Sequence, residues 1–282
     1  MNKKPLHFLP CLAAWGSAAI VTFTFFWLLS DILCNGGALI SWDFLTTAPK
    51  NAGRAGGIAP ILVSTLLIVG VAMMASLPLG LGTAILLAEL SSSHKGFSRF
   101  VRRSLDILAG VPSIVFGLFG NALFCKALGM GFSILSGGLT LACMVLPLII
   151  RSTEEGLRAV PKEYSLSAAA LGLSRITFFW HILIPEATSG LTVGIILGFG
   201  RALAETAALI FTSGYVDRMP SSLLDSGRAL SLHIFDLSMN VTGGDPNAYR
   251  SAFVLLILLL LIHNSATILT NFIFKKRISN HG

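Results

Sequence analysis

The sequence contains little charge for its length. Of its 282 residues only 12% are charged, against about 25% in a typical soluble domain, whereas 54% are hydrophobic and the mean hydropathy is +0.80. The four cysteines are scattered in or beside apolar runs, without a CxxC pair or a His/Cys ligand spacing, so we interpret them as small hydrophobic residues. The composition excludes an ordinary soluble domain and indicates an integral membrane protein.

Other signatures are missing as well. No G-x-x-x-x-G-K-[ST] phosphate-binding loop occurs, so any energy from ATP would have to come from another chain. No nucleophile-base or metal constellation is apparent, and we therefore expect no catalytic site, no metal and no cofactor of the chain's own. The net charge of +7 lies in short basic segments beside apolar runs, which indicates membrane topology rather than nucleic-acid binding.

Apolar runs long enough to cross a bilayer, about 20 residues each, set the expected architecture. The first is too long for the core of a signal peptide, and no clear small-residue cleavage site follows it. A tight glycine-rich turn between the third and fourth predicts a hairpin. We expect six spans, at about residues 9–33, 58–79 (apolar to Leu90), 108–128, 132–150, 189–211 and 252–274.

The distribution of Lys and Arg predicts the orientation, because cytoplasmic loops are enriched in both. Of the 20 such residues most fall on one side, in the segments around Lys3, Arg99, Arg151 and Lys275. That side carries both termini and the polar loop at residues 151–186, and we expect it to be cytoplasmic. The few on the other side are Lys50, Arg54, Lys126, Arg218, Arg228 and Arg250.

The loop at residues 151–186 is predicted to form a helix, a turn and a second helical segment. Pro161 suits a helix start, the alanines that follow favour helix, and Gly172 suits the left-handed residue after a helix end. Ser174 can cap the next segment, which Pro185 should end. The loop is either a docking element for a soluble partner or a solvated connector.

Arg201 and Glu205 lie in the middle of the fifth run. Charges at this depth cost a few kcal/mol and usually face a protein interior or a water-filled path. At i and i+4 they are predicted to share a helix face and to pair, with Arg201 roughly 18 Å from a helix start near Ser189. Because a guanidinium offers bidentate donors to an oxyanion, the two residues are either part of an anion path or a structural pair.

Three further features have open interpretations. Gly190, Gly194 and Gly198 form a small-residue ridge that permits close helix packing, either within this subunit or against a second one. Glu154 and Glu155 end the fourth run, as docking residues or as a solvated helix end. The outer segment 214–250 is either an interfacial helix or part of a surface that receives another protein.

The segment GLSRITFFWHILIP resembles the cytoplasmic signature of ABC-importer permeases, which reads Glu-Ala-Ala, three residues, Gly, nine residues and Ile-x-Leu-Pro. Gly172 and Pro185 occupy the signature positions, whereas Leu166 stands where the family has Glu and Ile184 where it has Leu. The resemblance narrows to phosphate-importer permeases of the PstA type, and spans about residues 41–274, when four more segments are added: ASLPLGLGTAILLAE, LAGVPSIVFGLFG, LPLIIRSTEEGLRAVPKEY and GFGRALAETAAL.

This resemblance implies an all-α, multi-pass type I permease of the bacterial cytoplasmic (inner) membrane. A second, homologous permease would pair with it in the bilayer, two ATPase subunits would dock beneath, and an external binding protein would deliver phosphate. Residues 1–57 would hold the first span and outer loop, 58–275 a core of five spans with the coupling loop 151–186, and 276–282 a cytoplasmic tail.

Within that picture Arg201 and Glu205 would belong to the phosphate path, with Glu205 holding Arg201 and limiting how tightly phosphate binds. The residues expected to couple to an ATPase are Glu154, Glu155, Pro161, Lys162, Glu163, Ala168, Ala169, Ala170 and Gly172. The alternatives are a permease for another oxyanion, such as molybdate or sulfate, and a self-sufficient secondary carrier or channel.

Overall fold

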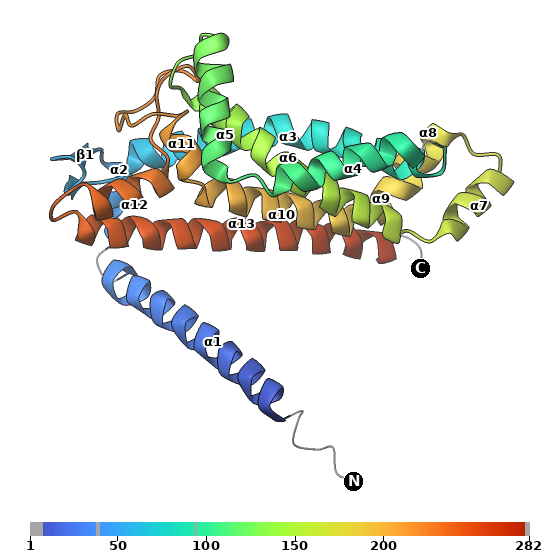
Figure 1. Ribbon diagram of the computed structural model, residues 1–282, viewed down its shortest axis with the longest axis horizontal. Coiled ribbons are helices and arrows are strands. Elements are labelled where there is room, and N and C mark those ends of the chain that lie inside the picture. The colour runs from blue at the N-terminus through green and yellow to red at the C-terminus, as the bar shows by residue number, and fades with distance from the viewer. Residues whose placement is uncertain (1–7, 38–39, 94, 280–282) are drawn as a thin grey trace.

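Long helices lying side by side form the body of the protein, which we describe from a computed structural model (Figure 1). The structure describes residues 8–37, 40–93 and 95–279. Its elements are α1 (Phe8–Gly36), α2 (Trp42–Thr46), β1 (Pro49–Lys50), β2 (Ala55–Gly56), α3 (Ala59–Ser93), α4 (Lys95–Ala109), α5 (Ser113–Gly120), the π-helix η2 (Asn121–Ala127), α6 (Ile134–Ala159), α7 (Lys162–Ala170), α8 (Arg175–Phe178), the π-helix η3 (Phe179–Leu183), α9 (Ile184–Glu186), α10 (Thr188–Ala204), α11 (Ala207–Ile210), α12 (Leu230–Met239) and α13 (Asp245–Ser279).

The prediction of an all-α protein with six spans is confirmed. Among the described residues, four continuous helices are long and apolar enough to cross a membrane, and the number reaches six when each of two bent helix pairs is taken as one span. The only strands among the described residues, β1 and β2, form a two-stranded antiparallel hairpin. The continuous candidates are Pro10–Gly36, Ala59–Ala88, Ile134–Ala159 and Asp245–Ser265.

The third span differs from its prediction as one helix at residues 108–128. Instead α4 contains the basic segment around Arg99 and ends at Ala109, and the chain then bends by 100° into α5 and η2. Pro112 explains the break, because proline lacks an N–H group and disfavours helix at the residue before it. Proline also precedes Ser113, where α5 begins, so its ring lies at a helix start that tolerates it.

The fifth span was predicted as one helix at residues 189–211, and this prediction was wrong at its outer end. The helix α10 stops at Ala204, Glu205 has an extended backbone with φ −74° and ψ 130°, and a new short helix, α11, starts at Ala207. At its other end, α10 meets the segment from α8 to α9 at a bend of 62°. The span is therefore interrupted next to its two charged residues.

The core lies where α3, α6 and α10 meet, and glycines let the helices approach closely. A Cβ atom on Gly138 of α6 would lie 2.6 Å from the Cβ of Val71 on α3. Gly80 of α3 faces Ile149 of α6 in the same way, at 2.7 Å. The largest side chains of this core are fully or nearly fully buried: Ile68, Met73, Leu141, Val145, Ile149, Leu203 and Leu209.

Helix α1 diverges from the bundle and touches it mainly through its last turns, which lie against α13 (Figure 1). Gly36 makes this contact possible, since a Cβ atom there would lie 2.9 Å from the Cβ of Phe253. The apolar side chains of α1 from Pro10 to Leu28 are exposed. The bundle has two distinct ends: α7 and α8 lie at one, and α2, the β-hairpin and α12 lie at the other (Figure 1).

Candidate transport and coupling sites

Arg201 lies in the last turn of α10, immediately before the interruption of the fifth span. Its side chain is exposed, and it makes no hydrogen bond or ion pair with any other residue that the structure describes. Thirteen residues separate it from Thr188 at the start of α10, which places it roughly 20 Å along the helix at 1.5 Å per residue. A guanidinium group is therefore presented on the surface of the bundle, near the end of a candidate span, and charges within spans usually face a protein interior or a water-filled path.

Glu205 does not pair with Arg201, which corrects the prediction from their i and i+4 spacing. The spacing has that meaning only on a continuous helix, and the helix ends at Ala204. The Glu205 side chain is buried, with 8% exposed, and its Oε1 atom accepts a hydrogen bond of 3.2 Å from the backbone N–H of Ala208. The carboxylate thus caps α11 while the guanidinium stays free.

Three side chains that the sequence did not single out hold this interruption and the elements next to it. The Ser231 hydroxyl, from α12, donates a 2.5 Å hydrogen bond to the backbone carbonyl of Glu205. The Asn121 side chain, from η2, donates to the carbonyl of Phe211 at 2.7 Å. Because Thr65 on α3 also accepts from the N–H of Leu230 at 2.8 Å, helices from three parts of the chain hold the segment.

The glycine ridge of α10 packs within this subunit, against α6. Gly156 of α6 lies so close to Gly190 that a Cβ atom on Gly156 would be 2.7 Å from the Gly190 Cα. Farther along, a Cβ on Gly194 would lie 3.2 Å from the Ser152 Cβ, and the Ser152 hydroxyl donates to the Gly190 carbonyl at 2.8 Å. Of the two interpretations left open by the sequence, the internal one holds for Gly190 and Gly194, and Gly198 likewise packs against α6.

The loop at residues 151–186, which we call the inner loop after the side predicted for it, has the predicted helix, turn and helical return. The helix α7 begins directly after Pro161, and Gly172 has a positive φ of +69°, the left-handed conformation expected there. Ser174 caps the next segment by accepting a 3.1 Å hydrogen bond from the N–H of Thr177. Pro185 lies inside α9 instead of ending the segment, and the bend follows it at Ala187.

Large apolar side chains are exposed on this loop, at one end of the bundle (Figure 1). Leu166 is 71% exposed and Leu171 77%, although both belong to a segment that is polar overall. Lys162, Glu163, Ala169 and Ala170 are also exposed, whereas Ala168 is 3% exposed and faces inward. The candidate coupling surface consists of Tyr164, Leu166, Leu171, Leu173 and Ile176.

Glu154 lies inside the protein, while its neighbour Glu155 is exposed. Its side chain is 4% exposed, and its Oε1 atom accepts from Arg102 Nε at 2.8 Å and from Arg158 Nη2 at 3.0 Å. Arg102 also donates to the carbonyl of Leu87 at 3.2 Å, so the network joins α3, α4 and α6. The prediction that Glu154 contacts an ATPase is not supported by this position, and Glu155 is the acidic residue here that a partner can reach.

The outer segment 214–250 contains the helix α12, with one face against the bundle and one exposed face. The helix packs on α13 and α3 through buried residues that include Leu232 and His233, while Phe235 and Met239 are exposed. Burial and the adjacent Arg228 lower the pKa of His233 to about 4, while Asp236 opposes the shift. Arg228 and Asp236 form an ion pair of 3.2 Å beside the ring. His233 is therefore neutral near pH 7 and has a structural position.

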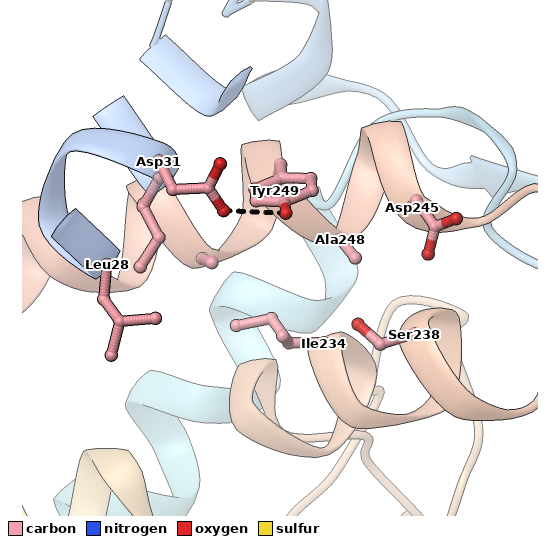
Figure 2. Close-up of a pocket in the computed structure, with 9 residues that line it drawn as sticks. Leu28, Asp31, Ile234, Ser238, Asp245, Ala248 and Tyr249 are labelled. Carbon is pink, nitrogen blue, oxygen red and sulfur yellow. Dashed lines mark hydrogen bonds between the residues drawn. The ribbon is translucent and has the colours of Figure 1, made fainter. Parts of the chain in front are cut away.

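A cavity of about 370 Å³ opens between the last turns of α1, α12 and the first turns of α13 (Figure 2). Figure 2 shows the Tyr249 hydroxyl donating to the carboxylate of Asp31 at 2.8 Å, with Asp245 on the same rim. Because its charged lining is two carboxylates, the cavity repels anions. Its lining does not include Arg201, and its charge is opposite in sign to that of the guanidinium.

Two further features of the described residues concern metal-ligating groups and a carboxylate with ordered partners. Among the described residues, no group of three or more His, Cys, Asp or Glu could hold a metal ion. The hydroxyl of Ser221 and its N–H both bind the carboxylate of Asp225, and these bonds lower the pKa of that exposed group. This contact orders an outer loop and brings no reactive group into proximity with another.

Comparison with known proteins identifies a matching family and related sequences. Residues 76–280 match the profile of a family described as binding-protein-dependent transport system inner membrane component. The chain is 33% identical over 284 residues to the probable ABC transporter permease protein YqgI of Bacillus subtilis (strain 168), covering 93% of this chain and 94% of that protein. It is 34% identical over 238 residues to the phosphate transport system permease protein PstA of Mycobacterium leprae (strain TN), covering 82% of this chain and 78% of that one.

Comparison with solved structures identifies a similar fold. The fold is similar to that of a chain of the MetNI methionine ABC transporter in an inward-facing conformation, with a TM-score of 0.65 over 77% of this chain and 95% of that one. At 17% sequence identity this likeness concerns the fold alone. It identifies the bent and continuous helices described above as the fold of an ABC type I importer permease.

Proposed function

The chain belongs to the family of binding-protein-dependent transport system inner membrane components and is a permease subunit of an ABC importer; from this premise we propose that its substrate is phosphate. The observation that carries the proposal is an unpaired, exposed arginine beside an interrupted span, in a chain whose relatives include phosphate permeases named PstA. Their identities of 32–34% extend over most of the chain.

Arg201 is the residue that we assign to the phosphate. Its planar guanidinium can donate two parallel hydrogen bonds to the oxygens of a tetrahedral oxyanion, and the structure leaves those donors unoccupied by other described residues. Interrupted helices with free polar groups at membrane depth are typical of places where a transporter contacts its substrate. The exposed side of Arg201 would face a second, similar permease, and the path would run between the two.

Glu205 acts beside the path. Its buried carboxylate caps α11, and its negative charge lowers the affinity of the neighbouring region for phosphate, so that the anion can leave. A passage requires binding strong enough for entry and weak enough for exit. This role replaces the direct support of Arg201 expected from the sequence.

Coupling to ATP hydrolysis is assigned to the inner loop. The coupling surface is apolar and exposed at the end of the bundle, and exposed apolar patches of this kind usually mark a protein contact. We assign it to the groove of an ATPase subunit, with Pro161, Lys162, Glu163, Glu155, Ala169 and Ala170 around it and Gly172 setting its turn. Ala168 supports the same element from its buried side.

The assembly would contain this permease, a second homologous one, two ATPase subunits and an external phosphate-binding protein, in the bacterial cytoplasmic membrane. The chain supports this division of labour, because its sequence has no phosphate-binding loop of its own. A secondary carrier would transport without partners, whereas an importer subunit depends on its ATPase. We therefore expect the purified chain alone in liposomes to transport no phosphate.

Substitution of Arg201 by Gln tests the path. We expect phosphate uptake by the assembled transporter to fall at least tenfold, the equivalent of about 1.4 kcal/mol, at unchanged expression. The control is Arg218→Gln, which removes an arginine from the exposed outer loop and should leave uptake near wild type. Undiminished uptake by the Arg201 variant would remove it from the path.

A further inference from the structure

The carbonyl group of Glu205 is left outside the helical hydrogen-bond ladder by the interruption of the fifth span. On a continuous helix it would accept the N–H of Leu209, but that N–H donates instead to the carbonyl of Thr206 at 3.2 Å. Within the bilayer no water is available to replace the missing donor, so an unsatisfied carbonyl there costs several kcal/mol. The interruption therefore needs a donor from elsewhere in the protein.

Ser231 supplies that donor from the outer helix α12. Its hydroxyl is 2.5 Å from the Glu205 carbonyl oxygen, and the serine itself is 7% exposed. The first turn of α12 is fixed in turn by Thr65, whose hydroxyl accepts the N–H of Leu230 at 2.8 Å. Both hydrogen bonds are buried and join segments far apart in the sequence, so the serine is held in place by α3 as well as by α12.

Without this donor, the segment has a competing arrangement that satisfies the carbonyl internally. If residues 204–207 rewound into helix, α10 and α11 would become one continuous helix, and the carbonyl would pair with the N–H of Leu209. In that helix Arg201 and Glu205 would be neighbours at i and i+4 and could form an ion pair. The arginine would then be occupied by the protein's own carboxylate.

We propose that Ser231 is a positioning residue that keeps the fifth span interrupted, and so keeps Arg201 free for the anion instead of paired with Glu205. The inference rests on the proposed function, because it takes Arg201 as the contact for phosphate. It assigns the outer helix α12 a control over the site: withdrawal of the serine lets the helix rewind, and Glu205 then competes with the anion for the guanidinium.

The test uses the assembled transporter in proteoliposomes, with phosphate-loaded binding protein at saturating concentration. Phosphate uptake and phosphate imported per ATP hydrolysed are measured for Ser231→Ala, for Glu205→Gln and for the double variant. We expect Ser231→Ala to lower both quantities at least fivefold, about the effect of losing one buried hydrogen bond. Adding Glu205→Gln should restore them to the level of the Glu205 variant alone, because the competing ion pair can no longer form.

Two controls separate this mechanism from general damage. Ser226→Ala removes another serine hydroxyl that donates to a backbone carbonyl, that of Ser213 at 3.1 Å, away from the interruption, and it should leave uptake near wild type. Thr65→Val loosens α12 without touching Ser231 and should lower uptake in the same Glu205-dependent way.

The outcomes are distinct. Wild-type uptake by Ser231→Ala, or an equal fivefold loss whether or not Glu205 is present, would overturn the inference, the second result showing a merely structural serine. Arg201→Gln, measured in parallel, tests the proposed function by itself. If the Arg201 variant transports normally, the assignment of Arg201 to the path fails. If the Arg201 variant is inactive while Ser231→Ala transports normally, only the role of Ser231 fails.

Discussion

Removal of the Glu154 carboxylate should destabilise the inner half of the bundle. In Glu154→Gln the side chain keeps its size and one acceptor oxygen but loses its charge, so Arg102 and Arg158 lose their common anionic partner. The two arginines come from different helices, α4 and α6, so the substitution weakens a contact between elements as well as one within a helix. A matched control is Arg218→Gln, which breaks the outer ion pair of Arg218 with Asp225.

The burial of each partner sets the expected magnitude. Breaking a fully buried ion pair costs about 3–5 kcal/mol, but here only the carboxylate is fully buried, at 4% exposed, whereas Arg102 is 23% and Arg158 47% exposed. Both arginines can regain water, and Arg102 keeps its hydrogen bond to the carbonyl of Leu87. We therefore expect a loss of about 2 kcal/mol. Arg218 is 65% exposed and 3.5 Å from Asp225, so the control should cost about 0–1 kcal/mol.

Thermal unfolding of the purified chain in detergent measures the difference. A loss of about 2 kcal/mol corresponds to a fall of roughly 4–8 °C in the unfolding midpoint for a chain of this order of size, whereas the control should stay within about 2 °C. Equal and small shifts for Glu154→Gln and Arg218→Gln would refute the reasoning. An effect of Glu154→Gln that appeared only with the ATPase bound would return that residue to the docking interface.

The remaining predictions concern packing, pH and docking. Gly190→Ala should destabilise the chain by about 1–3 kcal/mol because its Cβ would collide with the α6 backbone, while Gly200→Ala in the same helix, where a Cβ meets nothing within 4 Å, should be neutral or slightly stabilising in the same unfolding assay. The pKa of His233 is lowered from 6.5 to about 4, so its contribution to stability is fully present above pH 6.5 and is lost as the pH falls toward 4, by about 3 kcal/mol. His233→Gln should therefore make the unfolding midpoint depend less on pH over that range. An unchanged pH dependence in this variant would contradict the burial of the ring. Leu166→Asp should lower co-purification of the ATPase at least tenfold, with Leu166→Met as the control that retains binding; full retention by the Asp variant would remove α7 from the interface.

The architecture could be predicted from the sequence where a span is one continuous helix, because its length and composition are local properties. The runs that became α1, α3, α6 and α13 are long and apolar, and length together with composition is sufficient to predict such spans. The inner loop was predictable for a similar reason, since the glycine at 172 has local conformational requirements that few other residues meet. These features depend on neighbours in sequence.

The interruption at Glu205 could not be predicted in that way. Residues 201–210 include alanines and leucines that favour helix, and the donor that stabilises the break, Ser231, is supplied by a different helix. Glu154 is a comparable case, because the arginine that pairs with it from α4, Arg102, lies 52 positions away. In both cases a tertiary contact overrides the local preference, and the charged residues consequently acquire partners that spacing alone did not suggest.

The glycine ridge lies between these extremes. The spacing of Gly190, Gly194 and Gly198 correctly indicated a close helix contact, but the partner could not be chosen, because a second subunit and α6 would both fit such a surface. In the structure the partner is α6, where Gly156 packs against Gly190. The glycine spacing therefore predicted a close helix contact but did not identify the helix that makes it.

The central claim, that this chain is the phosphate-conducting permease of an ATP-driven importer, is tested most directly by ATP hydrolysis in the co-purified assembly. The rate is measured in proteoliposomes with binding protein loaded with phosphate, and with the corresponding proteins loaded with molybdate or sulfate. We predict that the phosphate-loaded protein stimulates hydrolysis and the others do not. Stimulation by a molybdate- or sulfate-loaded protein but not by the phosphate-loaded one would contradict the claim.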